Sequence, residues 1–206
     1  MKVLVGCEFS GVVRDAFRAR SHDAWSCDLL PSEGDSRWHL QCDVFTVLDR
    51  DWDLLIFHWP CTYLTRAQAG WFFNRPKKPK PDILYGYPRY RAMRHSARCF
   101  RRLLSSPILR IAGENPIPYR DARLIMGEPT QTIQPYQFGH TERKATCLWL
   151  RNLPLLRATD IVALPENKAD AQRLHWLPRT ENRWKERSRT FQGIADAMAE
   201  QWGGLR

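Results

Sequence analysis

Short apolar runs alternate with amphipathic segments along the first part of the chain. The runs KVLVGC (2–7), DAWSCDLL (23–30) and WDLLIFH (52–58) predict strands, because each is apolar and bounded by turn residues. Between the first two, GVVRDAFRAR (11–20) carries its apolar residues at helical spacing. This strand–helix–strand rhythm predicts a mostly parallel sheet with helices on both faces, and therefore an α/β fold.

The pattern continues into the second half of the chain. Residues 89–104 predict a helix with Met93, Ala97, Phe100 and Leu104 inward and a dense basic face outward. The remaining elements that the pattern predicts are a strand over 108–116, a hairpin over 137–150 and an amphipathic helix over 194–202. Because the chain has 206 residues and no internal repeat, we expect a single domain over 1–206 that is large enough for a catalytic domain.

Two segments break this rhythm. Residues 66–88 are rich in proline, basic and aromatic residues, which predicts a long mobile loop rather than a regular element. Loops of this length inside compact domains are usually functional or disordered. Residues 151–187 are punctuated by proline and predict a short irregular segment.

The composition indicates a basic, aromatic-rich protein. The net charge of +10 favours a polyanionic partner, although a merely soluble basic protein has the same total. Nine tryptophans favour the first interpretation, because basic and aromatic side chains together hold phosphates and stack on bases. No run is long enough for a membrane helix and no signal peptide is recognised, and six scattered cysteines without zinc spacing suit a reducing cytoplasm. A cytoplasmic protein without a metal site or membrane partner is expected.

Polar residues follow the predicted strands. Glu8-Phe9-Ser10-Gly11 follows the first strand, and its glycine allows a close backbone approach before a helix N-terminus. Asp28 follows the second strand at roughly the offset from Gly11 at which an acid meets ribose hydroxyls in dinucleotide-binding folds, and Asp43 lies after the next segment. Each acid alone could equally cap a turn or be solvated. Ligands of α/β sheets bind at the carboxyl ends of the strands, so together they predict a nucleotide-type site.

Cys61 and Glu114 follow two further predicted strands. A thiolate at one strand end can attack carbon 6 of a pyrimidine while a protonated carboxyl at the neighbouring end supports ring nitrogen 3. This pairing makes carbon 5 nucleophilic. The alternative is that Cys61 is a packed thiol and Glu114 a helix-capping acid.

These residues resemble the cytosine-carbon-5 DNA methyltransferases. Phe9-Ser10-Gly11 is similar to the first motif of that family, Pro60-Cys61 to its catalytic Pro-Pro-Cys, and Glu114-Asn115 to its Glu-Asn motif. The chain is also similar to a compact branch associated with phages and bacteria, with ENP, QFGH and KATCLWL segments and no large target-recognition domain. The resemblance covers most of the chain and implies a Rossmann-like methyltransferase fold that uses S-adenosylmethionine.

The resemblance also implies roles for individual residues. The catalytic residues would be Cys61, Glu114, Asn115 and Arg143. The cofactor would be bound by Glu8, Phe9, Ser10, Gly11, Asp28, Leu29, Asp43, Val44 and Pro60. DNA would be contacted by Trp59, Arg66, Arg75, Lys77, Lys78, Lys80 and Lys144. Because carbon 6 cannot be reached inside a duplex, the target base would be flipped, which costs least on a single strand.

The chain also departs from the family pattern. Trp59 stands where the family has the first proline of its catalytic tripeptide, and valines stand where the cofactor loop has its second glycine. The indole could stack on a base or fill the pocket. Three hypotheses follow: a monomeric DNA cytosine methyltransferase with relaxed sequence preference, a pyrimidine carbon-5 enzyme that delivers another one-carbon unit, and a DNA-binding relative without activity.

Overall fold

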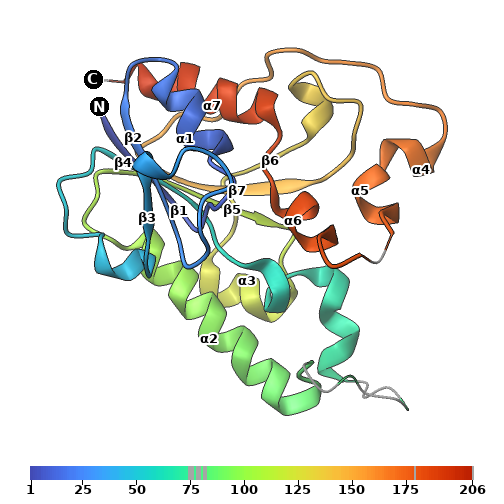
Figure 1. The fold of residues 1–206 in the computed structure, drawn as a ribbon. Helices are drawn as coiled ribbons and strands as arrows, with labels where there is room; N and C mark the ends of the chain where they lie inside the picture. The colour runs from blue at the N-terminus through green and yellow to red at the C-terminus, as the bar shows by residue number, and fades with distance from the viewer. Residues whose placement is uncertain (74–76, 78–79, 81–82, 179, 206) are drawn as a thin grey trace.

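A seven-stranded sheet runs through the centre of the protein (Figure 1). The structure is a computed structural model that describes residues 1–206 except 74–76, 78–79, 81–82, 179 and 206. The strands are β1 (Lys2–Gly6), β2 (Asp23–Asp28), β3 (His39–Gln41), β4 (Leu54–His58), β5 (Arg110–Pro116), β6 (Gln131–Ile133) and β7 (Thr146–Arg151). Their order is β3-β2-β1-β4-β5-β7-β6, with β7 antiparallel to both of its neighbours and the pairs among β1 to β5 parallel.

Helices and short 3₁₀ turns connect these strands. The α-helices are α1 (Val12–Arg18), α2 (Gly86–Leu104), α3 (Arg120–Met126), α4 (Lys168–Ala171), α5 (Arg173–Trp176), α6 (Arg183–Ser188) and α7 (Gln192–Gly203). The 3₁₀ turns are η1 (Ser36–Trp38), η2 (Val44–Thr46), η3 (Cys61–Tyr63), η4 (Arg66–Phe72) and η5 (Pro135–Gln137). Among the residues that the structure describes, no helix combines the length and apolar content that crossing a membrane requires.

Each face of the sheet buries its own apolar core. Alternate side chains of a strand point to opposite faces, so Leu54 and Ile56 of β4 pack toward α1 and α7, whereas Leu55 and Phe57 pack toward α2 and α3. Figure 1 shows α1 and α7 on one side of the sheet and α2 and α3 on the other. The predicted fold class, a Rossmann-like α/β fold with helices on both faces of a mostly parallel sheet, is confirmed.

The sheet order indicates where a ligand would bind. β1 lies between β2 and β4, so the chain connections run away from β1 in opposite directions on its two sides. In open α/β sheets, such a switch point leaves a crevice outside the carboxyl ends of the strands. Residues 7–11, 28–30 and 58–61 lie at the carboxyl ends of β1, β2 and β4 and therefore border this crevice.

Two local expectations were wrong. Residues 66–88 are not entirely a loop: η4 occupies Arg66–Phe72, where Phe72 is buried against Tyr119, and α2 begins at Gly86. Pro88 fits inside that helix because the first turn needs no intrahelical N–H donor. The predicted hairpin over 137–150 is instead formed by β6 and β7. The inward face predicted for α2 is confirmed: Met93, Ala97 and Phe100 are buried, and Leu104 is half-buried against the same core. The segment 151–187 contains α4, α5 and part of α6 between irregular stretches.

Candidate active site

The carboxyl ends of β4 and β5 bring a histidine and a carboxyl together. The parallel register pairs His58 with Glu114, so both side chains leave the same face of the sheet. Nδ1 of His58 lies 3.0 Å from Oε2 of Glu114, and the two side chains are 8% and 17% exposed. Among the described residues, Nε2 of His58 has no hydrogen-bond partner. The ends of these strands therefore hold a buried pair of titratable groups with one unused ring nitrogen.

The two groups shift each other's protonation. Burial raises the pKa of Glu114, but the hydrogen bond and charge of His58 outweigh it and hold the pKa below its usual value. Burial lowers the pKa of His58, and the hydrogen bond and charge of Glu114, with the charge of Glu8, raise it above its usual value overall. The contact therefore favours the protonated imidazole together with the ionised carboxylate.

Cys61 stands at the start of the turn that follows β4. Pro60 precedes it with a φ of −51°, and the N–H groups of Leu64 and Thr65 donate to the Cys61 carbonyl at 3.0 and 3.3 Å. The guanidinium of Arg89 on α2 donates to the Thr62 carbonyl at 2.8 Å. These bonds hold an exposed cysteine residue at the carboxyl edge of the sheet, next to the end of β5.

The neighbouring charges change the pKa of the Cys61 thiol. Desolvation by the surrounding protein raises its pKa first, and the Glu114 carboxylate raises it further. Lys144 and Arg187 oppose this rise, because cations favour the thiolate. Cys61, Glu114 and Lys144 are therefore within electrostatic reach of one another.

Lys144, rather than its neighbour Arg143, lies near Cys61 and Glu114. Burial lowers the pKa of Lys144, whereas Glu114 and Cys61 raise it, and its Nζ donates to the carbonyls of Arg187 and Arg189 at 2.8 and 3.4 Å. Arg143 is exposed, and its backbone N–H donates to the carbonyl of Ala171. Consecutive side chains leading into a strand project to opposite sides, which explains why the adjacent residue is the one at the site. The structure thus places Lys144 at the site and Arg143 on the surface.

Asn115 and Trp59 stabilise the turn that presents Cys61. The amide nitrogen of Asn115 donates to the Trp59 carbonyl at 2.7 Å, and Asn115 is only 1% exposed. The indole N–H of Trp59 donates to the Ser96 hydroxyl on α2 at 2.8 Å, and its ring meets that of Phe45 edge-on. Trp59 thus packs between α2 and Phe45, with its indole nitrogen bonded to α2.

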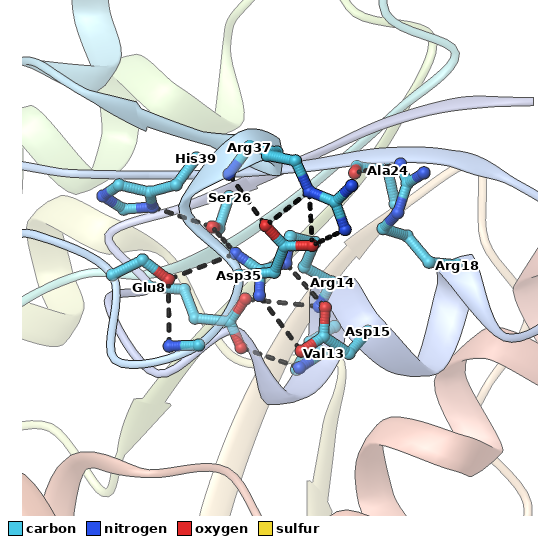
Figure 2. Close-up of polar contacts among 12 residues, drawn as sticks. Glu8, Val13, Arg14, Asp15, Arg18, Ala24, Ser26, Asp35, Arg37 and His39 are labelled. Carbon is cyan, nitrogen blue, oxygen red and sulfur yellow. Dashed lines mark hydrogen bonds and ion pairs between the residues drawn. The ribbon is translucent and has the colours of Figure 1, made fainter.

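The loop between β1 and α1 is closed around Glu8 (Figure 2). The buried carboxylate of Glu8 accepts hydrogen bonds from the backbone N–H groups of Val13 and Arg14 at 2.7 and 3.3 Å. Gly11 adopts a φ of 75°, and a Cβ at this position would collide with the Arg14 guanidinium. Glu8 therefore satisfies helix amides that could otherwise bind an anionic ligand group.

The ends of β2 and β3 fit the nucleoside part of S-adenosylmethionine. Asp28 and Asp43 both raise the pKa of Cys7 after β1, so their carboxylates lie near this strand end. Asp28 accepts from the Leu30 N–H at 2.9 Å, and Leu29 beside it is 72% exposed. A carboxylate suits sugar hydroxyls and an exposed leucine suits an apolar ring face. The donor set is therefore compatible with this cofactor.

The other predicted cofactor residues lie around the same edge. Ser10 is half-buried, Pro60 is exposed, and Val44 is buried with a side-chain methyl 2.7 Å from where a Cβ of Gly6 would stand. Asp43 also caps η2, because its carboxylate accepts from the Phe45 N–H at 3.0 Å. Phe9 is 7% exposed.

The segment before α7 covers this edge, which the sequence did not predict. The rings of Phe9 and Trp184 are 5.6 Å apart, and Arg189 forms an ion pair with Glu33 at 2.7 Å. Because Lys144 also binds the Arg187 and Arg189 carbonyls, this segment joins the β1–α1 loop to the approach to β7. His58, Trp184 and Arg189 were missed because their partners are remote in the chain. Only the position of His58, three residues before Cys61 at a strand end, was a readable signal.

The residues predicted to contact DNA differ in exposure, since Trp59 and Lys144 are half-buried. Arg66, Lys77 and Lys80 are exposed, whereas Arg75 and Lys78 lie outside the described residues. Within the described part of the chain, no group of His, Cys, Asp and Glu side chains is arranged to hold a metal ion.

Comparisons with known proteins find similarity only among solved structures. No protein-family model matches the sequence, and no curated protein sequence is significantly similar to it. One similar structure is that of a protein described as a DNA modification methyltransferase encoded within a prophage of E. coli, with 16% identity and a TM-score of 0.41. The match covers 87% of this chain and 56% of that one, so this chain spans little more than half of its length. A likeness at this level carries no argument about function, which depends on the geometry of the site.

Proposed function

We propose that the protein transfers a methyl group from S-adenosylmethionine to carbon 5 of cytosine in DNA, with little sequence preference. The observation that supports this proposal is that Cys61 and Glu114, at the carboxyl ends of β4 and β5, meet Lys144, which lies just before the antiparallel strand β7. A nucleophile, an acid and a cation within electrostatic reach of one another are what addition to a pyrimidine ring requires. The short segment 151–187 leaves little chain for reading a target sequence.

Cys61 would act first. Its thiolate adds to carbon 6 of cytosine and forms a carbon–sulfur bond, while the electrons of the 5,6 double bond shift toward ring nitrogen 3 and carbon 5. Lys144 favours the thiolate, because a nearby cation lowers the pKa of the thiol. Transfer of the methyl group to carbon 5, loss of the carbon-5 proton to a base and elimination of the thiolate then restore the ring and the free enzyme.

His58 and Glu114 would handle the proton at ring nitrogen 3. The pair shares one proton across 3.0 Å, so His58 can supply it to the Glu114 carboxylate when negative charge develops on the ring. Asn115 holds the Trp59 carbonyl and thereby fixes the turn before Cys61. In this scheme His58 and Asn115 are positioning residues, whereas Cys61 and Glu114 touch the base.

S-adenosylmethionine would supply an electrophilic methyl group when bound. Asp28 would accept hydrogen bonds from its sugar hydroxyls, and Leu29 and Asp43 would lie beside its adenine. Phe9, Ser10 and Gly11 would line the path toward Cys61, whereas Glu8 would keep the α1 amides occupied. The exposed Arg66, Lys77 and Lys80 would bind phosphates around the flipped base.

The test is transfer of labelled methyl groups to single- and double-stranded DNA by the wild type and by Cys61→Ala. Cys99→Ala is a matched control, because Cys99 lies on α2, where its thiol contacts the His95 ring. We expect Cys61→Ala alone to lose both methyl transfer and covalent trapping on DNA that contains 5-fluorocytosine. Transfer that survives in Cys61→Ala would contradict the proposed mechanism.

A second candidate is a DNA-binding relative without methyl transfer. It is favoured by the raised pKa of Cys61, the ionised Glu114 and the occupation of the α1 amides by Glu8. The same assay separates the two: DNA binding without label transfer, and without binding of S-adenosylmethionine, supports this candidate. Transfer of a different one-carbon group would instead appear as an unlabelled mass increase on cytosine.

A further inference from the structure

The outer face of α2 is a continuous arginine surface. Met93, Phe100 and Leu103 are fully buried on its inner face. The outer face carries the exposed residues Arg91, Arg94, His95, Arg98, Arg101 and Arg102. The helix contains no aspartate or glutamate, so no acid on the helix itself neutralises this charge.

A hollow of about 520 Å³ lies on this face. It is lined by Tyr87, Tyr90, Arg91, Arg94, His95 and Arg98. None of the three lining arginines forms an ion pair with the residues that the structure describes. The Tyr90 hydroxyl donates to Asp121 of α3 at 3.1 Å, and the guanidinium of Arg94 lies 6.0 Å from the centre of the Tyr90 ring. The hollow therefore combines three arginine side chains with the ring of Tyr90, which the hydrogen bond to Asp121 holds in place.

The inner face of the same helix is tied to the candidate active site. Arg89 donates to the Thr62 carbonyl next to Cys61, and Ser96 accepts from the Trp59 indole. The arginine face is thus rigidly connected to the turn that presents the thiol. From Arg91 to Arg98 the helix rises about 10 Å, which is the axial length of about three base pairs.

We propose that the outer face of α2 binds the sugar–phosphate backbone of the nucleic acid at nucleotides outside the reacting one. Charge complementarity carries the assignment, because unpaired arginines at helical spacing match a run of phosphates. Tyr87, which is 72% exposed, adds a ring on which a base of a single strand can stack. The proposal rests on the proposed function for its nucleic-acid substrate, and it extends the footprint beyond the active site.

The test compares two variants of equal charge. In the first, Arg91, Arg94 and Arg98 are replaced by Gln, which keeps helix propensity and removes the cations. In the control, the exposed Arg20, Arg50 and Arg157, which lie outside α2, are replaced by Gln. Fluorescence anisotropy measures the affinity of both for single-stranded oligonucleotides of about 6 and about 30 nucleotides over a range of salt, because these lengths bracket a single binding groove.

We expect the α2 variant to bind the long oligonucleotide more weakly than the control variant does. The slope of log K against log salt should fall by about 0.7 for each phosphate of a single strand that an arginine no longer neutralises, and so by about 2 for three arginines. Affinity for the short oligonucleotide should change less. Circular dichroism and the melting temperature confirm that both variants are folded.

Three results would overturn the proposal. These are equal salt slopes for the two variants, equal loss of affinity for short and long oligonucleotides, and unchanged DNA binding with lost sedimentation on phosphatidylserine vesicles. The last would assign the face to a membrane surface. Binding that depends on α2 without any methyl transfer would refute the proposed function and leave this inference standing. Methyl transfer with α2-independent binding would refute this inference alone.

Discussion

The buried His58–Glu114 pair makes a prediction that a double-mutant cycle can test. Two unit charges 3.0 Å apart attract by about 5.5 kcal/mol at an effective dielectric constant of 20. Desolvation of both groups offsets several kcal/mol of this attraction, which leaves a coupling free energy of about 2 to 3 kcal/mol between the two side chains. The cycle uses His58→Ala, Glu114→Ala and the double variant, so that the cavities left by truncation largely cancel. Each single variant leaves an unpaired charge and should lose about 3 kcal/mol of unfolding free energy.

The pH dependence distinguishes an ion pair from a neutral hydrogen bond. The pKa of His58 is raised, so its contribution is fully present below the usual histidine pKa and is lost as pH rises through the raised value. The pKa of Glu114 is lowered, so its contribution is present above the usual glutamate pKa and is lost as pH falls through the lowered value. Coupling should therefore be largest between about pH 4.5 and pH 6.5.

Urea unfolding of the four proteins at several pH values measures this coupling. By about pH 9 we expect it to fall to about 1 kcal/mol, the contribution of a neutral hydrogen bond. Coupling below about 0.5 kcal/mol at every pH would refute the pair. Coupling that increases from neutral to alkaline pH would show that the assigned protonation states are wrong.

Three further substitutions test other parts of the site. Lys144→Met should move the pH midpoint of Cys61 alkylation upward, because Lys144 lowers the pKa of that thiol. An unchanged midpoint would show that Lys144 does not affect the thiol. Trp59→Phe should cost about 1 kcal/mol of unfolding free energy through the lost hydrogen bond to α2, with unchanged affinity for single-stranded DNA; a large loss of affinity would instead support base stacking. Gly11→Ala should cost at least about 1 to 2 kcal/mol of unfolding free energy, because the φ of 75° is left-handed and Arg14 fills the space that a Cβ would need. Gly70→Ala, where a Cβ would meet open space, should have little effect. Equal melting temperatures for the two variants would contradict this reasoning.

Local pattern predicted most of the framework, because strand and helix periodicity are properties of neighbouring residues. The alternation of Leu54 to Phe57, the inner face of α2 and the closing helix α7 all followed from spacing alone. The position of Cys61 directly after a strand likewise followed from its neighbours. Residues 66–72 were misassigned, because Phe72 forms a helical turn only where Tyr119 and Tyr90 provide a pocket.

Long-range register decided what surrounds Cys61. Glu114 meets His58 only because β4 and β5 pair as they do, and a shift of one strand by one residue would put the two side chains on opposite faces of the sheet. Lys144 rather than Arg143 reaches the site because of the way the chain enters β7, and Trp184 covers Phe9 from a segment far along the chain. The sequence by itself determined the layered α/β fold and the residues that end its strands. Only the tertiary structure decided which side chains at those strand ends interact electrostatically, because pKa values and ion pairs depend on distances that no local pattern contains.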